Sequence, residues 1–183
     1  ISASATLTSD LTLNAQGDSN AIFIIQIDGA LSTASNSKVI LSNDAMACNV
    51  FWKVEGLVSM ASGTSMKGTV IANNAAINMS TLDTLEGRAL SIAGAVTVDG
   101  VMAYTPTGCG SPINLGPTAP NLGRTSCYGI FSSDGPVTNS GSSTISGDVG
   151  TNVGLTTGYN PLTVSGTIHP IPDTSTANAA ADL

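Results

Sequence analysis

Charged side chains are scarce in this chain, and their scarcity excludes several classes of protein. Only 9% of the 183 residues are Asp, Glu, Lys or Arg, and the formal net charge is −7. Five Lys and Arg residues are too few to form the basic stripe that nucleic-acid binding requires. The same acidic balance argues against docking on an anionic lipid surface. We therefore expect no nucleic acid and no lipid surface among the partners.

Long hydrophobic runs and aromatic side chains are also missing. Mean hydropathy is +0.27, yet no apolar run approaches the roughly 18 residues that a transmembrane helix needs. Aromatic residues make up 4% of the chain, so the core must be built from aliphatic side chains. No signal peptide is visible, because Ile1 already lies in a strand-like pattern. We expect no membrane insertion and an extracellular location, secreted or at the cell surface, for a mature fragment or a slice of a longer chain.

Catalytic and metal-binding sets are missing as well. His169 is the sole histidine, Arg88 and Arg124 are the only arginines, and the acidic residues are scattered. No Ser/His/Asp or Cys/His arrangement can be assembled, and no cysteine pair has the C-x-x-C spacing of a zinc or redox site. We expect no enzyme activity, no cofactor and no metal, and we interpret His169 as a structural turn residue.

The three cysteines are Cys48, Cys109 and Cys127. Cys109 and Cys127 flank the most loop-like segment of the chain, and a disulfide between them would close that segment in an oxidising compartment. Cys48 directly precedes the apolar run NVFW, and we expect it to be a small buried hydrophobic residue.

Short apolar runs separated by Ser, Thr, Gly, Asn and Ala fill most of the sequence. They follow one another from Ile22 to Val98, each about five residues long, as expected for short strands joined by tight turns. Helical periodicity is absent from this stretch. The character changes again in the terminal DTSTANAAADL, where Asp173, Thr174 or Ser175 can cap a helix that begins in the Ala-rich residues.

Internal repeats predict how these strands are arranged. MKGTV (residues 66–70) matches LEGRA (residues 85–89) roughly 19 residues later, and TISGDV matches TVSGTI at the same spacing. Three short strands in a period near 20 suit one coil of a triangular β-solenoid, whose stacked coils share a core. The alternative, an antiparallel β-sandwich, would show regular Asn-Gly or Asp-Gly turns, and only Asp28-Gly29 and Asp99-Gly100 occur.

We therefore predict an all-β fold, a right-handed parallel β-solenoid with the start of a helix at its C-terminus. Its coils would occupy residues 1–104 and 125–183, joined by a Pro- and Gly-rich linker at residues 105–124 that breaks every period. Alternation and coil spacing give a set of inward-facing residues: Phe23, Ile25, Ile27, Val50, Trp52, Val54, Val70 and Leu90.

The chain resembles the bacterial and fungal ice-binding β-solenoid family. The resemblance is carried by QGD with FIIQI, by ACNVFW, by EGRAL with GAVT, and by TISGDVG with GTIH. In that family the segment like residues 128–183 comes first and the segment like residues 1–101 comes last. The swapped order here suits either a circular permutant or a window cut across tandem copies. In the family the last coil lies beside the first, so both segments can still form one solenoid.

The resemblance implies ice binding through a flat face that carries a Thr-Ala/Gly-x-Thr/Asn pattern once per coil. Coils repeat about every 4.8 Å, close to a repeat of the ice lattice, so threonine columns can hold ordered water. We expect two exposed columns, with Thr64 also pointing outward. The candidate residues are Thr33, Ala34, Asn36, Ser62, Thr64, Ser65, Thr81, Thr84, Ser140 and Ser143.

Two other interpretations of the Ser and Thr content stay open. These residues could simply occupy solvent-facing strand positions. The solenoid could also be a structural module of a tandem-repeat surface adhesin or extracellular filament that does not bind ice. Its partners would then be neighbouring copies rather than ice or ordered water, because solenoid ends expose unpaired strands unless they are capped.

Overall fold

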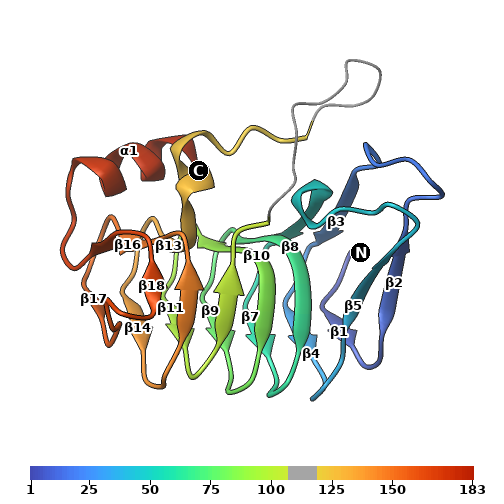
Figure 1. The fold of residues 1–183 in the computed structure, drawn as a ribbon, viewed down its shortest axis with the longest axis horizontal. Helices are drawn as coiled ribbons and strands as arrows, with labels where there is room; N and C mark the ends of the chain where they lie inside the picture. Colours follow the sequence, from blue (N-terminus) through green and yellow to red (C-terminus); the bar gives the residue numbers. More distant parts are fainter. Residues whose placement is uncertain (107–118) are drawn as a thin grey trace.

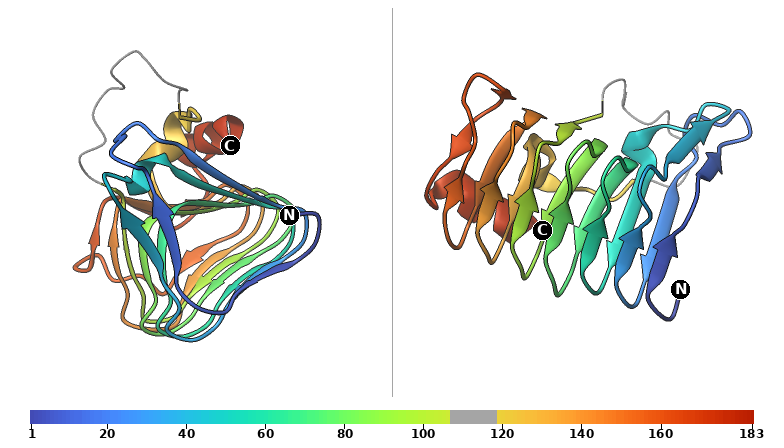
Figure 2. Two further views of the ribbon diagram at one scale, coloured as in Figure 1. Left: turned by 90° about the vertical axis from the view of Figure 1, so that its right-hand side faces the viewer. Right: turned by 90° about the horizontal axis from the view of Figure 1, so that it is seen from below.

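The chain folds into stacked coils, each of which turns around the same long core (Figure 1). The computed structural model describes residues 1–106 and 119–183. Viewed along the stack, the coils have a roughly triangular outline (Figure 2). Between described strands, every pairing is parallel, for example β3 (Phe23–Ile27) with β6 (Val50–Val54). The predicted parallel β-solenoid is therefore confirmed, and the antiparallel sandwich is excluded.

The first face of the solenoid is one continuous parallel sheet. Its strands follow one another in the order of the coils, without a crossover. They are β1 (Ala5–Leu7), β4 (Leu31–Thr33), β7 (Val58–Met60), β9 (Ile77–Met79), β11 (Val96–Val98), β14 (Val137–Asn139) and β17 (Thr156–Thr157).

The second and third faces share two long strands, β8 (Ser65–Ala72) and β10 (Thr84–Ser91), which bend from one face onto the other. The remaining strands of the second face are β2 (Leu11–Asn14), β5 (Val39–Ser42), β12 (Met102–Tyr104), β15 (Thr144–Ser146) and β18 (Val164–Ser165). The third face is completed by β3, β6, β13 (Tyr128–Ser132), β16 (Asp148–Thr151) and β19 (Ile168–His169).

The two segments on either side of the predicted linker belong to the same stack. Strand β10 pairs with β12 through its first half and with β13 through its second half. One coil is therefore completed by strands that lie before and after the predicted linker, residues 105–124, most of which falls outside the described residues. The two segments therefore form one continuous solenoid.

The core is aliphatic, as predicted from the shortage of aromatic residues. Seven of the eight predicted inward residues lie in one cluster or pack against it, and Val50, Val54 and Val70 are fully buried. Leu90 is the exception, and its assignment to this core is wrong. In β10 the inward position belongs to Ala89, and Leu90 faces outward.

Leu90 is nevertheless buried, because a second cluster forms outside the third face. Leu90, Tyr128, Phe131 and Ala179 make up this cluster, in which helix α1 (Thr174–Asp182) lies over the strands (Figure 1). The helix begins where the sequence predicts, with Asp173 as its N-cap. The Asp173 carboxylate accepts a hydrogen bond from the backbone N–H of Thr176 at 2.9 Å.

Two short 3-10 helices also lie beside the third face: η1 (Ala47–Asn49) and η2 (Gly123–Cys127). They contain Cys48 and Cys127, and the predictions made for both cysteines are corrected by the structure. Cys127 is an exposed free cysteine, so its predicted disulfide with Cys109 is wrong. Cys48 is disulfide-bonded and is not the unmodified hydrophobic residue that we expected. Cys109 lies outside the described residues.

Leu90→Ala tests the second cluster. The substitution removes a fully buried side chain from beneath α1, so the free energy of unfolding should fall by about 2–5 kcal/mol. The matched control is Leu162→Ala, at a side chain that is 93% exposed, which should cost less than about 0.5 kcal/mol. Urea denaturation measures both values. Equal effects would show that the helix does not cover Leu90 in solution.

Candidate functional site

A single column of small polar side chains runs along the outside of the first face. In β1, β7, β9 and β11 an outward-facing middle residue lies between two inward apolar ones, as in β7, where Ser59 lies between buried Val58 and Met60. The strands are in one-to-one register. The outward residues therefore stack as the hydroxyl column, which consists of Thr6, Ser32, Ser59, Asn78, Thr97, Thr138 and Thr157.

The local sequence places this column by a simple rule. In five of the seven coils a glycine stands three residues before the column residue, as Gly94 stands before Thr97. A Cβ atom at Gly94 would lie 2.5 Å from the backbone carbon of Ala75 in the neighbouring coil. Glycine therefore lets the corners of successive coils approach closely, and the strand that follows starts at the same height each time.

Most hydroxyl-column side chains are free to bind water. Thr6 and Ser32 are hydrogen-bonded to each other through their hydroxyl groups at 2.9 Å. Within the described part of the chain, no side-chain hydrogen bond is found for Ser59, Thr97 or Thr138. The threonines also present methyl groups. The column thus offers hydrogen-bonding groups at the coil repeat of about 4.8 Å, interleaved with apolar groups.

The neighbouring positions on the first face are mostly apolar. Alanine is common there, at Ala30, Ala76 and Ala95 before the hydroxyl column and at Ala34 and Ala61 after it. The larger side chains of Leu57 and Leu155 are exposed at two of the positions before it. Asp99, exposed at the edge, accepts a hydrogen bond from the Thr81 hydroxyl at 3.0 Å. Because long and charged side chains are missing from its strands, the first face presents a regular, low surface.

The other two faces differ in charge and covering. The second face carries an ion pair between Lys67 and Glu86, at 2.8 Å, in the middle of its outer surface. On the third face, Lys53 pairs with Glu55, and helix α1 covers the coils at the far end. Neither surface repeats one small uncharged residue type from coil to coil, so the first face is the candidate functional site.

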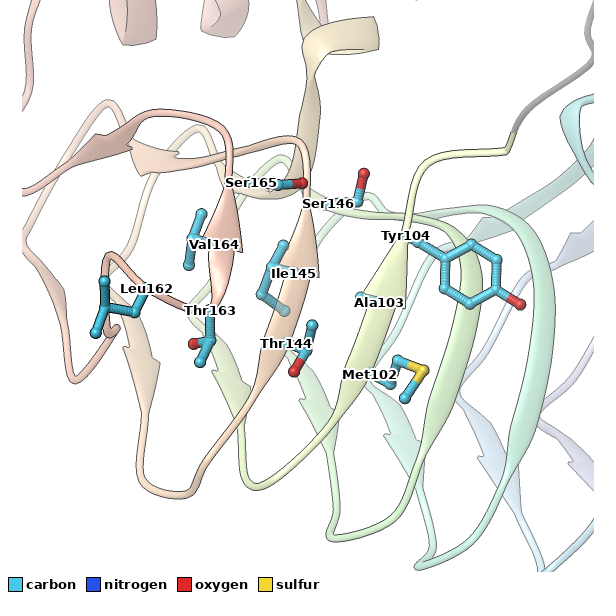
Figure 3. Close-up of a pocket in the computed structure, with 10 residues that line it drawn as sticks. All are labelled: Met102, Ala103, Tyr104, Thr144, Ile145, Ser146, Leu162, Thr163, Val164 and Ser165. Carbon is cyan, nitrogen blue, oxygen red and sulfur yellow. The ribbon is translucent and has the colours of Figure 1, made fainter.

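A shallow trough lies on the second face (Figure 3). It has a volume of about 320 Å³ and lies outside β12, β15 and β18, between Tyr104 at one end and Leu162 at the other. Thr144 and Ser146 contribute hydroxyl groups to its floor. Its lining holds no carboxylate, histidine or lysine that could act as an acid or a base at neutral pH.

The structure divides the sequence-predicted site residues into exposed and buried groups. Exposed are Asn36, Ser62, Thr81 and Ser140, all in turns that join the first face to the second. Ala34, Ser65 and Thr84 are half-buried. The predicted exposure of Thr33, Thr64 and Ser143 is wrong, because their exposed fractions are 8%, 0% and 3%.

We call residues 33–36, 62–65 and 81–84, which were matched to the Thr-Ala/Gly-x-Thr/Asn pattern, the quartets. The predicted alignment of the first quartet is wrong by two residues. The structure pairs Ser32 with Ser59 and Lys38 with Ser65, an offset of 27 residues in each case (59 − 32 and 65 − 38). Aligning Thr33 with Ser62 would require an offset of 29 (62 − 33). Lys38, rather than Asn36, is therefore the neighbour of Ser65, and the two continuous columns predicted from the quartets do not form.

The buried threonines tie the turns together from inside. The hydroxyl groups of Thr33 and Thr64 are hydrogen-bonded at 2.7 Å, and the Thr33 hydroxyl accepts the backbone N–H of Ala61 at 2.9 Å. A tyrosine at either position would overpack the corner and destabilise the fold by about 1–3 kcal/mol. Thr33→Tyr and Thr64→Tyr are therefore unsuitable as probes of the surface.

Sequence analysis missed the hydroxyl column itself, although a signal was present. The glycine that precedes each column residue by three positions recurs at Gly29, Gly56, Gly94, Gly135 and Gly154. This spacing identifies a Ser or Thr in each of these coils. The search for complete quartets instead selected the turns that follow the strands.

Asp83 is a fully buried carboxylate at the same corner. Its oxygens accept backbone N–H groups from Ser80 at 2.7 Å and from Thr64 at 2.9 Å. Burial raises the pKa of Asp83 to about 6, although these hydrogen bonds oppose the shift. The folded protein therefore holds a proton on this group over a pH range in which the unfolded chain does not.

Stability should consequently fall as pH rises from about 4 to about 6. In this window the folded state binds more protons than the unfolded state, because the ordinary aspartate pKa is about 3.9. Above pH 6 the loss is complete. Asp83→Asn has no titrating group at this position, so its stability should change less over the same window. Thermal unfolding of both proteins at several pH values measures the difference, and parallel curves would contradict the assignment.

The described residues show no other obvious centre for chemistry. Within residues 1–106 and 119–183, no group of three or more His, Cys, Asp or Glu side chains is placed to hold a metal ion. His169 is 7% exposed, and its Nδ1 lies 2.6 Å from Asp173 Oδ2 at the N-cap of α1, a contact that suits a structural role. In the same part of the chain, no helix is long and apolar enough to cross a membrane.

Comparison with known proteins gives consistent matches. Residues 1–103 match the Ice-binding-like family. An ice-binding protein from Nostoc sp. (strain HG1) is 41% identical over 99 residues, which cover 54% of this chain and 36% of that protein. An ice-binding protein from Colwellia sp. is 32% identical over 106 residues, covering 58% and 40% respectively. The chain spans less than half the length of these curated relatives.

Solved structures are similar as well. The crystal structure of an ice binding protein from an Antarctic bacterium, Flavobacteriaceae, has a TM-score of 0.58 and 58% sequence identity, covering 98% of this chain and 42% of that one. A second ice binding protein, from an Antarctic biological consortium, has a TM-score of 0.53 and 47% identity, covering 54% and 45%.

Proposed function

Because the chain belongs to the Ice-binding-like family, we propose that it binds ice through the outer surface of the first face. The hydroxyl column is the central row of contacts. The exposed turn residues Asn36, Ser62, Thr81 and Ser140 extend the contact at one edge. The relatives named above are ice-binding proteins by name, and the surface described here gives this chain a means of doing the same.

The observation that carries the proposal is the unbroken register of the first face. Seven strands place one Ser, Thr or Asn each at the same height, on strands that carry no charged side chain. Water bound to such a column adopts the coil repeat, which is about 4.8 Å and close to a repeat of the ice lattice. Methyl groups restrict the positions of that water, while hydroxyl groups anchor it. An ordered layer of this kind can merge with the surface of an ice crystal.

We propose an extracellular location, secreted or at the cell surface, because ice forms outside cells and the low charge suits that setting. Ice and ordered water are then the partners. No catalytic role is assigned, since the trough and the first face lack paired acid and base groups.

Stacking on neighbouring copies is a second candidate role. Within the described residues, the coil formed by β1, β2 and β3 has one unpaired edge, and its core residues Leu7, Leu11 and Phe23 stay partly exposed. A further coil added there would bury these residues and pair the free backbone groups. Sedimentation of the protein at several concentrations tests for this association.

Thr97→Tyr is the direct test of ice binding. Thr97 is an exposed member of the hydroxyl column, between Asn78 and Thr138 on the neighbouring strands. The bulky ring should prevent close approach of an ice surface, so thermal hysteresis and inhibition of ice recrystallisation should both be lost. The free energy of unfolding should change by less than about 0.5 kcal/mol, since the site is on the surface.

The matched control is Thr144→Tyr, which places the same substitution at an exposed position on the second face. This variant should keep full ice activity. Equal loss in both variants would assign the effect to something other than the first face. A wild-type protein without thermal hysteresis or recrystallisation inhibition would contradict the proposed function altogether.

A further inference from the structure

We infer that Asp83 is a positioning residue of the proposed ice-binding surface, which acts from inside the solenoid by holding three consecutive turns in register. The turns are residues 34–37, 61–64 and 80–83, at the corner between the first and second faces. This inference rests on the proposed function, because it concerns the same surface. In it, a buried side chain keeps the exposed turn residues of that surface aligned from coil to coil.

Asp83 connects its own turn to the turn of the preceding coil. One carboxylate oxygen accepts the backbone N–H of Ser80 at 2.7 Å, which closes the turn that presents Thr81. The other oxygen accepts the backbone N–H of Thr64 at 2.9 Å, in the turn that presents Ser62. Both oxygens are therefore used, and each fixes the backbone within a few residues of an exposed hydroxyl group.

Thr64 carries the connection one coil further. Its hydroxyl donates to the carbonyl oxygen of Ala61 and accepts from the Thr33 hydroxyl at 2.7 Å. Thr33 in turn accepts the backbone N–H of Ala61 at 2.9 Å. The buried relay thus consists of Asp83, Thr64 and Thr33, and it extends from the fourth coil to the second. The three side chains of the relay are at most 8% exposed.

The relay ends at Asp83 because the next coil differs. By register, Val101 occupies the corresponding position there, and it has no side-chain hydrogen-bonding group. Val101 instead donates its backbone N–H to the Ser143 hydroxyl at 3.0 Å. The residues at the position of Asp83 in the adjacent coils, Thr64 and Val101, do not titrate. The charged group on the neighbouring turn is Asp99, which lies outside and bonds Thr81.

The exposed residues above the relay are those at the edge of the proposed surface: Asn36, Ser62 and Thr81. Short side chains such as these depend on their backbone for position. Removing the carboxylate frees two backbone N–H groups in a buried site and lets the turns at residues 61–64 and 80–83 move independently. The strand pairing of the solenoid does not depend on this carboxylate. The substitution should therefore disturb the positions of the exposed turn residues and leave the fold intact.

The experiment compares Asp83→Ala and Asp83→Asn with the control Asp44→Asn, at an exposed position between the second and third faces. Thermal hysteresis and recrystallisation inhibition are measured on protein shown by circular dichroism to be folded near 0 °C. Asp83→Ala should lose a large part of the activity. Asp83→Asn, whose amide oxygen still accepts one N–H, should keep more of it, and Asp44→Asn should keep nearly all. Thr64→Val, which cuts the next link while preserving shape, should act in the same direction as Asp83→Ala.

The pH profile of the wild-type protein separates positioning from simple stabilisation. Protonation of the Asp83 carboxyl removes one acceptor from the relay, so ice activity should increase as pH rises from about 4 to about 6, whereas conformational stability decreases over that range. A purely structural role would make the two quantities change together. The activity of Asp83→Asn should be flat with pH.

Two failures are distinguishable. If wild-type protein shows no ice activity, or Thr97→Tyr keeps it, the proposed function is wrong. If wild-type protein is active and Thr97→Tyr is not, but folded Asp83→Ala and Thr64→Val match the wild type at every pH, the role assigned to Asp83 is overturned.

Discussion

The parallel backbone ladder between successive coils is the constraint on which the rest of this protein depends. Coils differ in length, with 27 residues from Ser32 to Ser59 and 19 from Ser59 to Asn78, yet the pairing of their strands keeps every side-chain column in register. The ladder also dictates where side chains cannot be. A Cβ atom at Gly87 would lie 1.8 Å from the carbonyl oxygen of Gly68 in the next coil. Glycine at such corners is therefore a requirement of stacking, and it fixes the start of the strands that follow.

Composition follows from this geometry. The space inside a coil is narrow, so valine, isoleucine, leucine and methionine fill it, and large aromatic side chains are few. On the outer surface of the first face, long charged side chains would interrupt the regular column of small residues. The fold and the proposed function therefore both favour a low charge content, as found in the sequence. Two of the aromatic residues, Tyr128 and Phe131, lie in the second cluster beneath α1, whereas Phe23, Trp52 and Tyr159 lie in or against the main core.

Much of the fold could be predicted from sequence, because repeats and alternation depend on residues that are close together in the chain. The coil period, the strands and the cap at Asp173 are of this kind. Leu90 was misplaced because its burial depends on a helix that is distant in the chain. Thr64 was misplaced because turns obey no alternation, so its inward direction is set by hydrogen bonds between coils. Thr33 ends β4, where alternation from buried Leu31 directs it inward, and it was misplaced because the sequence pattern was given more weight than that alternation. Cys48 shows the same limit, since a disulfide depends on tertiary proximity.

Each coil contributes one residue to the hydroxyl column, and this has a consequence for how such a protein can change in size. Seven stacked residues span six intervals, or roughly 29 Å at about 4.8 Å each. Duplication of a single coil would lengthen this row by one interval while leaving all older positions in phase with the new one. The extent of the surface is then a count of coils, so gene segments of one coil can tune it in equal steps. Any insertion that is not a whole coil must leave the stack at a corner, where it does not disturb the periodicity.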